Sequence, residues 1–89
     1  MKLWILEPVN ELPDDDNPWK PWHERVFGFV IQADDENEAR NIAHSEAGRE
    51  NDGENSAVRY PWLDPKYSEC VELVPGLDAG VVIRDWRAA

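Results

Sequence analysis

The residues best suited to contact a ligand lie in a loop rich in proline and tryptophan, with the sequence Asn-Pro-Trp-Lys-Pro-Trp-His at positions 17–23. Proline restricts the backbone in advance, and a rigid aromatic pair loses little entropy when it stacks on a partner. Residues 60–62, Tyr-Pro-Trp, repeat this chemistry. The pattern predicts a site for a small planar ligand with cations at its rim, formed by Trp19, Lys20, Trp22, His23, Arg25, Tyr60, Trp62, Lys66 and Arg84.

The same aromatic loops have a structural interpretation of equal weight. A chain of 89 residues buries only a modest fraction of its surface, so both loops could fold back as lids over the open face of a small sheet. One ring pointing inward and another pointing outward would satisfy both interpretations.

Acidic residues form a second candidate surface. Nineteen Asp and Glu against nine Lys and Arg give a formal charge of -10, which repels nucleic-acid phosphates and anionic lipid. We therefore expect no direct binding of nucleic acid or membrane, whereas a basic protein surface is a suitable partner. The simpler interpretation of the charge is solubility. The residues predicted for protein interaction are Asp14, Asp15, Asp16, Asp34, Asp35 and Glu36.

No recognisable motif for catalysis is present, and we expect a binding protein rather than an enzyme. A nucleophile needs a base within reach; the candidates are Cys70, Ser45, Ser56 and Ser68 with His23 or His44. None of them sits in a known catalytic pattern. A small enzyme with a site shared between subunits is a further alternative.

We expect neither a metal nor a cofactor. The oxygen-rich segments 14–16 and 50–55 do not match a calcium loop. The predicted helix opens on acidic residues that would repel a phosphate, so phosphate groups would have to be met by side chains such as Lys20, Arg25, Arg59, Lys66, Arg84 or Arg87.

The single cysteine and the N-terminal residues predict a cytoplasmic location. One cysteine, Cys70, cannot form an intramolecular disulfide. The N-terminal apolar run is ended by Glu7 and Pro8 and is too short for a signal peptide or a membrane span.

Hydrophobic patterning predicts the elements that must position these residues. Residues 2–9 read as a strand inside a sheet, and the β-branched and aromatic residues of 26–33 as a second strand. Between them, residues 10–25 carry three prolines, which predicts an ordered loop. Residues 67–74 and 81–86 predict an antiparallel hairpin.

One helix is expected at residues 36–47. Asp35 and Glu38 form a capping pair at its start, and Gly48 stands where a left-handed C-terminal cap would fit. Its apolar stripe consists mainly of alanine, which lets a helix lie close to a sheet. The whole chain thus predicts one α+β domain of order β-β-α-β-β, with an antiparallel or mixed four-stranded sheet and one helix packed on one face. Its exposed sheet edges could pair two copies into a homo-oligomer.

Several segments together resemble a family of small bacterial and phage proteins for which no activity is established. These segments are Asp16-Asn17-Pro18-Trp19 with Pro21-Trp22, the Phe27-Gly28-Phe29-Val30 strand, Glu38-Ala39-Arg40 with Ala47-Gly48, and Pro61-Trp62-Leu63-Asp64-Pro65-Lys66-Tyr67-Ser68 with Cys70. The resemblance implies a shared shape and a genomic setting without catalytic residues. Small acidic phage proteins often resemble inhibitors of host defence, which implies that this chain sequesters a nucleotide-derived signal or covers a basic protein surface.

Overall fold

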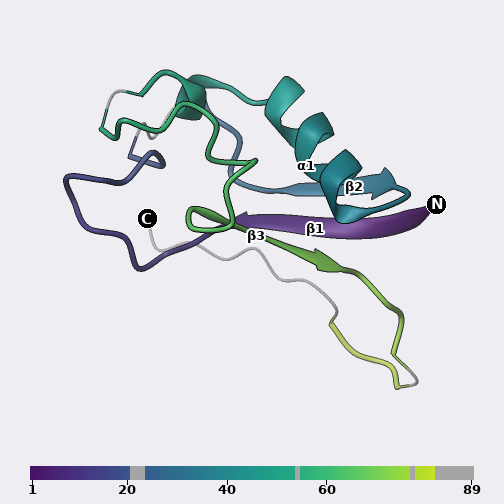
Figure 1. Cartoon of the computed structure of the whole chain (residues 1–89). Helices are drawn as coiled ribbons and strands as arrows, with labels where there is room; N and C mark the ends of the chain where they lie inside the picture. The colour runs from purple at the N-terminus through teal and green to yellow at the C-terminus, as the bar shows by residue number, and fades with distance from the viewer. Residues whose placement is uncertain (21–23, 54, 77, 82–89) are drawn as a thin grey trace.

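The computed structural model describes residues 1–20, 24–53, 55–76 and 78–81. In these residues, β1 (Lys2–Pro8), β2 (Phe29–Ala33) and β3 (Ser68–Glu72) form an antiparallel sheet in the order β2-β1-β3. The helix α1 (Glu36–Ser45) lies on one face of this sheet and is followed by a 3-10 helix, η1 (Arg49–Asn51) (Figure 1). The prediction of a small α+β fold with one helix is confirmed.

The central strand is β1, as its continuous apolar run predicted. It pairs with β2 on one side and with β3 on the other. Leu6 is fully buried and lies opposite Phe29 of β2 and Cys70 of β3. The strand ends at Pro8, one residue before the expected limit, although the Val9 amide still donates a hydrogen bond of 2.9 Å to the Tyr67 carbonyl oxygen.

The second strand begins later than predicted, at Phe29 rather than at Val26. The amide of Val26 donates to the carboxylate of Glu50, at 3.1 and 3.2 Å, and so is not used in the sheet. Glu50 is 1% exposed and also accepts from the Gly48 amide at 3.0 Å. A buried carboxylate must be hydrogen-bonded, and Glu50 takes the Val26 amide as one of its donors. This interaction keeps Val26 out of the strand, although its residue type favours a strand.

The predicted helix start is confirmed. The carboxylate of Asp35 accepts from the Glu38 amide at 2.8 Å, while the Glu38 carboxylate accepts from the Asp34 amide at 2.9 Å. This reciprocal pair satisfies amides that have no partner inside the helix. The small apolar stripe also packs as expected, with Ala39 and Ala43 fully buried.

The predicted helix end is wrong. The helix stops at Ser45 instead of residue 47, and Gly48 has a φ of -109° rather than a left-handed conformation. Glycine is required there for a different reason: a Cβ atom at this position would overlap the carbonyl oxygen of Glu24. The same oxygen accepts from the Arg49 amide at 2.7 Å. The segment after the helix is therefore held against residue 24 by close backbone contact.

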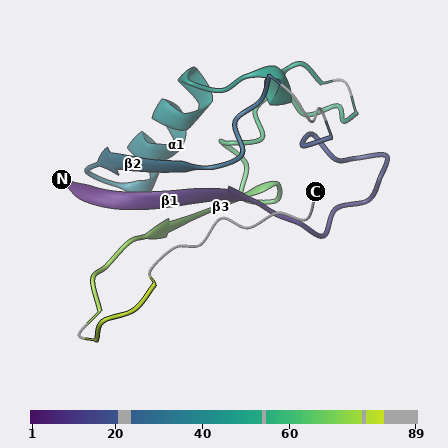
Figure 2. The same ribbon diagram turned by 180° about the vertical axis from the view of Figure 1, so that it is seen from behind.

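The expected four strands and the β-β-α-β-β order are not confirmed. The strand predicted at residues 67–74 is the shorter β3, and Val81 is not in a strand. The remainder of the predicted fourth strand, residues 82–86, lies outside the described residues. Beyond β3, the described chain leaves the sheet on the side away from α1 (Figures 1 and 2).

The core lies between the sheet and α1 and extends beneath the loops. Trp62 is fully buried and meets two other rings edge-on, with centroid distances of 4.7 Å to Trp19 and 4.9 Å to Phe29. The complete cluster of buried apolar residues comprises Leu6, Trp19, Ile31, Ala33, Ala39, Ala43, Trp62 and Tyr67.

One buried cation joins α1 to the rest of the core. Arg40 is 5% exposed and donates to the Trp62 carbonyl oxygen at 3.0 Å, and to the hydroxyl and carbonyl oxygens of Ser68 at 2.8 and 3.2 Å. Its Nε atom pairs with Glu36 at 2.8 Å. Because its donors are engaged in these bonds, the charge is accommodated in the interior and links the helix to β3.

Candidate functional site

Two of the predicted stacking residues are part of the core. Trp19 is 5% exposed and Trp62 is 0% exposed. The indole of Trp19 donates to the Tyr67 carbonyl oxygen at 3.0 Å, and that of Trp62 donates to Glu50 at 2.8 Å. A planar ligand cannot stack on either ring without displacing the core. Tyr60, by contrast, is 53% exposed.

The lid interpretation predicted that the aromatic loops cover the open face of the sheet, but the rings of Trp19 and Trp62 pack elsewhere. They belong to the same buried cluster as Ala39 and Ala43 of α1. The loops therefore enlarge the core on the helix-bearing side of the sheet. The described rings of these loops, Trp19 and Trp62, thus pack on the helix-bearing face and not on the opposite one.

The predicted cations contact different parts of the loops. Lys20 pairs with Asp14 at 3.6 Å, and Lys66 pairs with Asp16 at 3.5 Å. The guanidinium of Arg25 lies 3.9 Å from the ring centroid of Phe27. The other predicted ligand-binding residues, Trp22, His23 and Arg84, lie outside the described residues.

Asp16, predicted for protein interaction, joins two loops. Its carboxylate accepts from the Tyr67 hydroxyl at 2.8 Å and from the Ser56 hydroxyl. The hydrogen bond from Ser56, followed by that from Tyr67, holds the pKa of this carboxyl below its ordinary value. Asp16 thus connects the proline-rich loop to the segment before β3.

The acidic residues at the start of α1 are also used in the fold. Asp35 caps the helix through Glu38, and Glu36 pairs with Arg40. In the other acidic segment, Asp14 and Asp15 have exposed side chains. Three of the six predicted acidic residues, Asp16, Asp35 and Glu36, therefore have a structural role that is independent of any partner.

The candidate nucleophiles on β3 are not in catalytic surroundings. Ser68 is fully buried, and its hydroxyl donates to the Pro61 carbonyl oxygen at 2.7 Å. Burial raises the pKa of the Cys70 thiol, which opposes formation of the reactive thiolate. Among residues 1–20, 24–53, 55–76 and 78–81, no group of three His, Cys, Asp or Glu side chains could hold a metal ion.

A different surface stands out: the face of the sheet opposite α1, which we call the open face. Directly paired residues of antiparallel strands point to the same side. Ile5 pairs with Val30 of β2 and Val71 of β3, so these three side chains form a row across the sheet. Val30 is 54% exposed and Val71 57% exposed, while Ile5 between them is half-buried.

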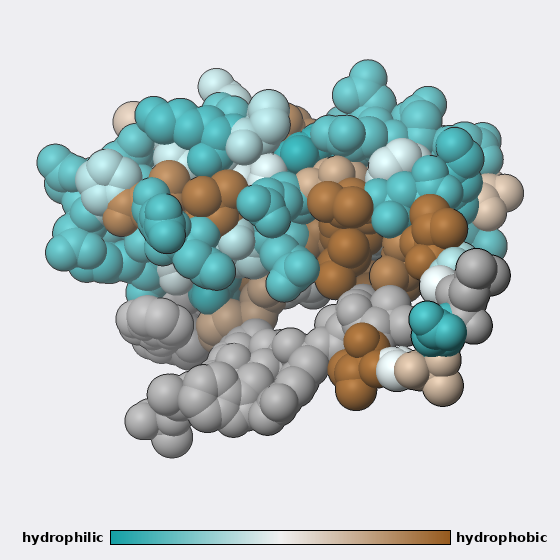
Figure 3. Space-filling model, turned by 90° about the horizontal axis from the view of Figure 1, so that it is seen from below, coloured by the Kyte–Doolittle hydropathy of each residue, from teal (hydrophilic) through white to brown (hydrophobic). Residues whose placement is uncertain are grey.

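A second row, beside the first, contains Leu3 of β1 and the polar Gln32 of β2, which pair directly. Leu3 is two residues before Ile5 and therefore points to the same face; it is 45% exposed. The amide of Leu73 donates to the Leu3 carbonyl oxygen at 2.8 Å, which extends the apolar surface beyond the end of β3. Seen from the side opposite α1, hydrophobic surface gathers in patches bordered by hydrophilic surface (Figure 3).

The third row of the open face is acidic and contains a hollow. Glu7 lies opposite Glu69 of β3, and both side chains are exposed. On the β2 side of Glu7 there is a hollow at Gly28, which has no side chain of its own. The hollow is about 270 Å³ and is lined by Ile5, Leu6, Glu7, Phe27, Gly28, Phe29 and Val30.

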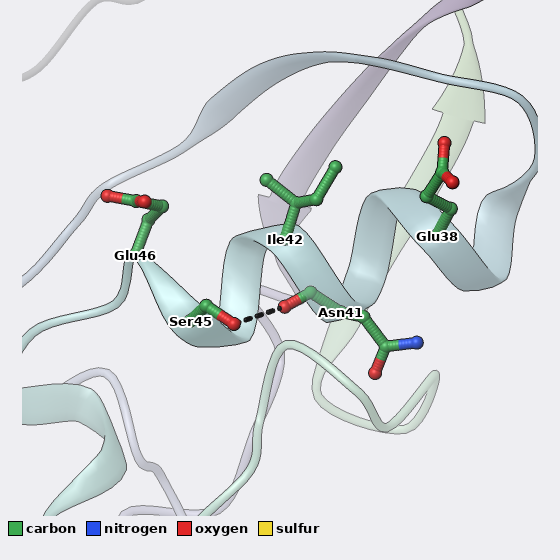
Figure 4. A pocket seen from close by; sticks show the side chains of 5 residues that line it. All are labelled: Glu38, Asn41, Ile42, Ser45 and Glu46. Atoms are coloured by element: carbon green, nitrogen blue, oxygen red, sulfur yellow. Dashed lines mark hydrogen bonds between the residues drawn. The ribbon is translucent and has the colours of Figure 1, made fainter.

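A second hollow lies on the outer face of α1, but it lacks opposing walls. Glu38, Asn41, Ile42, Ser45 and Glu46 line it, all from the helix or its C-cap (Figure 4). The Ser45 hydroxyl donates to the Asn41 carbonyl oxygen at 3.0 Å and is occupied within the helix. A convex helix surface of this kind cannot enclose a small ligand.

Comparison of the chain with protein families, with curated proteins and with solved structures gave no match. The fold and the surface define a small α+β domain in which α1 packs on one face of the sheet and the open face lies on the other side. Within the described residues, no helix is long and apolar enough to cross a membrane.

The open face could have been found in the sequence from one signal. Leu3 and Ile5 alternate with Trp4 and Leu6, so β1 carries apolar residues on both of its faces. A single helix covers only one face of a sheet. The continuous apolar run predicted a strand inside the sheet, and it equally predicts an apolar surface on the face that the helix does not cover.

Proposed function

We propose that this protein is a non-enzymatic binding protein that docks another protein on the open face of its sheet. The observation that carries the proposal is the exposed apolar row of Val30, Ile5 and Val71, continued by Leu3. Contiguous apolar surface bordered by polar residues is typical of protein interaction sites. The arrangement supports a binding role without requiring any reactive group.

Burial of the aromatic rings favours a protein partner over a small planar ligand. Trp19 and Trp62 are held in the core by indole hydrogen bonds, and the two rings pack edge-on against each other. A flat apolar row, in contrast, complements an extended or helical segment of a protein. The sequence analysis also predicted a protein partner, but it placed the interaction surface on acidic residues of the loops instead of on the sheet.

The predicted fourth strand is compatible with this proposal. We propose that the rest of the predicted strand, residues 82–86, adds to the outer edge of β3 in an antiparallel hairpin, since β3 is at the end of the strand order and residues 75–80 supply turn-forming Pro and Gly. Addition at that edge would widen the sheet and leave the row at Ile5 in place.

Site-specific photocrosslinking tests the proposed function. A photoreactive phenylalanine analogue is placed at Val30 or Val71 of the full chain in the cells that produce it, and irradiated. We expect one discrete crosslinked protein from both positions. The matched control is Ile42, a similarly apolar residue on the outer face of α1 that is 38% exposed. Crosslinking at residue 42 to the same extent, or none at 30 and 71, would contradict the proposal.

A further inference from the structure

The acidic row of the open face identifies the kind of segment that would dock there. Glu7 and Glu69 lie directly opposite each other on β1 and β3. Two like charges in such a pair destabilise a sheet. Neither carboxylate takes part in an ion pair among the described residues, where Lys2 pairs with Glu72 and Lys66 with Asp16. A cation placed between Glu7 and Glu69 would relieve their repulsion.

The hollow beside Glu7 is suited to a single side chain. Its volume of about 270 Å³ lies just below the roughly 300–1,000 Å³ of sites that enclose drug-sized ligands. Apart from Glu7 and Gly28, all of its lining residues are apolar, and they form the walls around Gly28. An aromatic or branched aliphatic group from a partner would therefore be the complementary occupant.

The hollow and the acidic pair are close enough to be filled by one segment. Continuing the β1–β2 register beyond Leu6 and Phe29 brings Gly28 opposite Glu7, with Glu69 on the other side. Adjacent strands lie about 4.8 Å apart. The hollow and the centre of the acidic pair are thus separated by roughly one to two strand spacings, a distance that neighbouring residues of one chain can span.

We propose that the partner presents an apolar side chain to the hollow at Gly28 and, one or two residues away, an arginine or lysine to Glu7 and Glu69. Arginine suits the pair best because its planar guanidinium can bond two carboxylates at once. The apolar row at Ile5 and the neighbouring Leu3 then receive the rest of the segment. This inference rests on the proposed function, because it specifies the partner of the same face.

The charge of the whole molecule agrees with this occupant. The formal charge of -10 attracts a basic segment over long range and raises its association rate. The same charge opposes docking of a second copy, which would bring two acidic rows together. A basic-apolar segment of another protein is therefore favoured over self-association.

A selection from a displayed random peptide library on the full chain tests the inference. We expect enriched peptides to contain an aromatic or branched residue within two positions of arginine or lysine. The variant E7Q/E69Q should raise the Kd of these peptides about tenfold, which corresponds to about 1.4 kcal/mol. The matched control E11Q/E46Q removes the same charge from other exposed glutamates and should change the Kd less than about twofold, since distant surface charges are screened by salt.

The outcomes separate this inference from the proposed function. Peptides that lack basic residues and bind E7Q/E69Q as well as the original chain, yet lose binding in V71D, would overturn the inference and leave the proposed function standing. If no selected peptide depended on Val30 or Val71, both would fail. Two other results would also overturn the inference. If the chain sedimented as a dimer and V71D dissociated it, the face would bind a second copy. If peptides were selected by the R84Q/R87Q variant but not by the original chain, the face would bind residues 82–89 of the same chain.

Discussion

The two faces of the sheet are built from adjacent residues of the same strands, yet within the described part of the chain only the face beneath α1 is covered. On the face beneath α1, Leu6 is 0% and Ile31 is 7% exposed, whereas on the open face Leu3 is 45% and Val30 is 54% exposed. The residue types are nearly the same. Among the described residues, the difference arises because α1 and the loops pack on one face only, which leaves apolar side chains exposed on the other.

The largest expected effect concerns the covered face where the loops extend its core. Trp62→Ala removes the ring that contacts Trp19 and Phe29 and deprives Glu50 of the indole donor. We expect a loss of about 3–5 kcal/mol in the free energy of unfolding, measured by urea denaturation. Tyr60→Ala, two residues away and exposed, should change it by less than about 0.5 kcal/mol. If Trp62→Ala and Tyr60→Ala lowered the free energy of unfolding equally, the assignment of Trp62 to the core and Tyr60 to the surface would be contradicted.

Neighbouring residues of β2 compare the two faces directly. Ile31→Ala should lower the free energy of unfolding by about 2–5 kcal/mol, because it opens a cavity in the core. Val30→Ala, on the open face, should lower it by less than about 1 kcal/mol, because the side chain is already half-exposed. Paired denaturation curves measure both. A large loss at Val30 would mean that another part of the chain covers the open face.

The close backbone contact after α1 provides the next test. Gly48→Ala places a Cβ atom against the Glu24 carbonyl oxygen, so we expect a loss of about 1–3 kcal/mol from overpacking. Gly76→Ala is the matched control, since no atom lies within 4 Å of its added Cβ. Thermal unfolding of the two variants compares them. If Gly48→Ala were as stable as Gly76→Ala, the close backbone contact between residues 24 and 48 would be incorrect.

The smallest expected effect is the pH dependence due to Asp16. Its folded-state pKa lies below the ordinary value of 3.8 because Ser56 and Tyr67 donate to the carboxylate. The resulting stabilisation is complete above the ordinary value and is lost as the pH falls through the folded-state pKa. In acid, Asp16→Asn should therefore lose stability less steeply than the original chain, as followed by urea denaturation at a series of pH values. Asp15→Asn should follow the original profile, and a D16N profile parallel to it would contradict the assigned role.

Local signals in the sequence predicted the elements better than their ends. Alternating and periodic apolar residues located β1, β2, α1 and β3, and the capping pair of Asp35 and Glu38 fixed the helix start. The start of β2 was missed because it depends on Glu50, which is distant in sequence and binds the Val26 amide. The helix end was missed because Gly48 is required by contact with residue 24 rather than by its own conformation.

The candidate site was the least predictable part because it depends on strand pairing. Tryptophan and aspartate attracted attention by residue type, whereas Trp19 and Asp16 are engaged within the fold. The apolar part of the open face consists of ordinary valine, leucine and isoleucine side chains. They become a continuous row only when the register places Val30 and Val71 on either side of Ile5, and that register is a property of three distant segments.

The central claim is that the open face binds a protein segment, and NMR mapping on the full chain tests it most directly. Backbone amide shifts are followed while a peptide selected by the original chain is added. We predict that the largest shifts occur at Leu3, Ile5, Gly28, Val30 and Val71, with small changes on the outer face of α1. Shifts concentrated on α1 or on the loop at residues 10–20, with the sheet unaffected, would contradict the account.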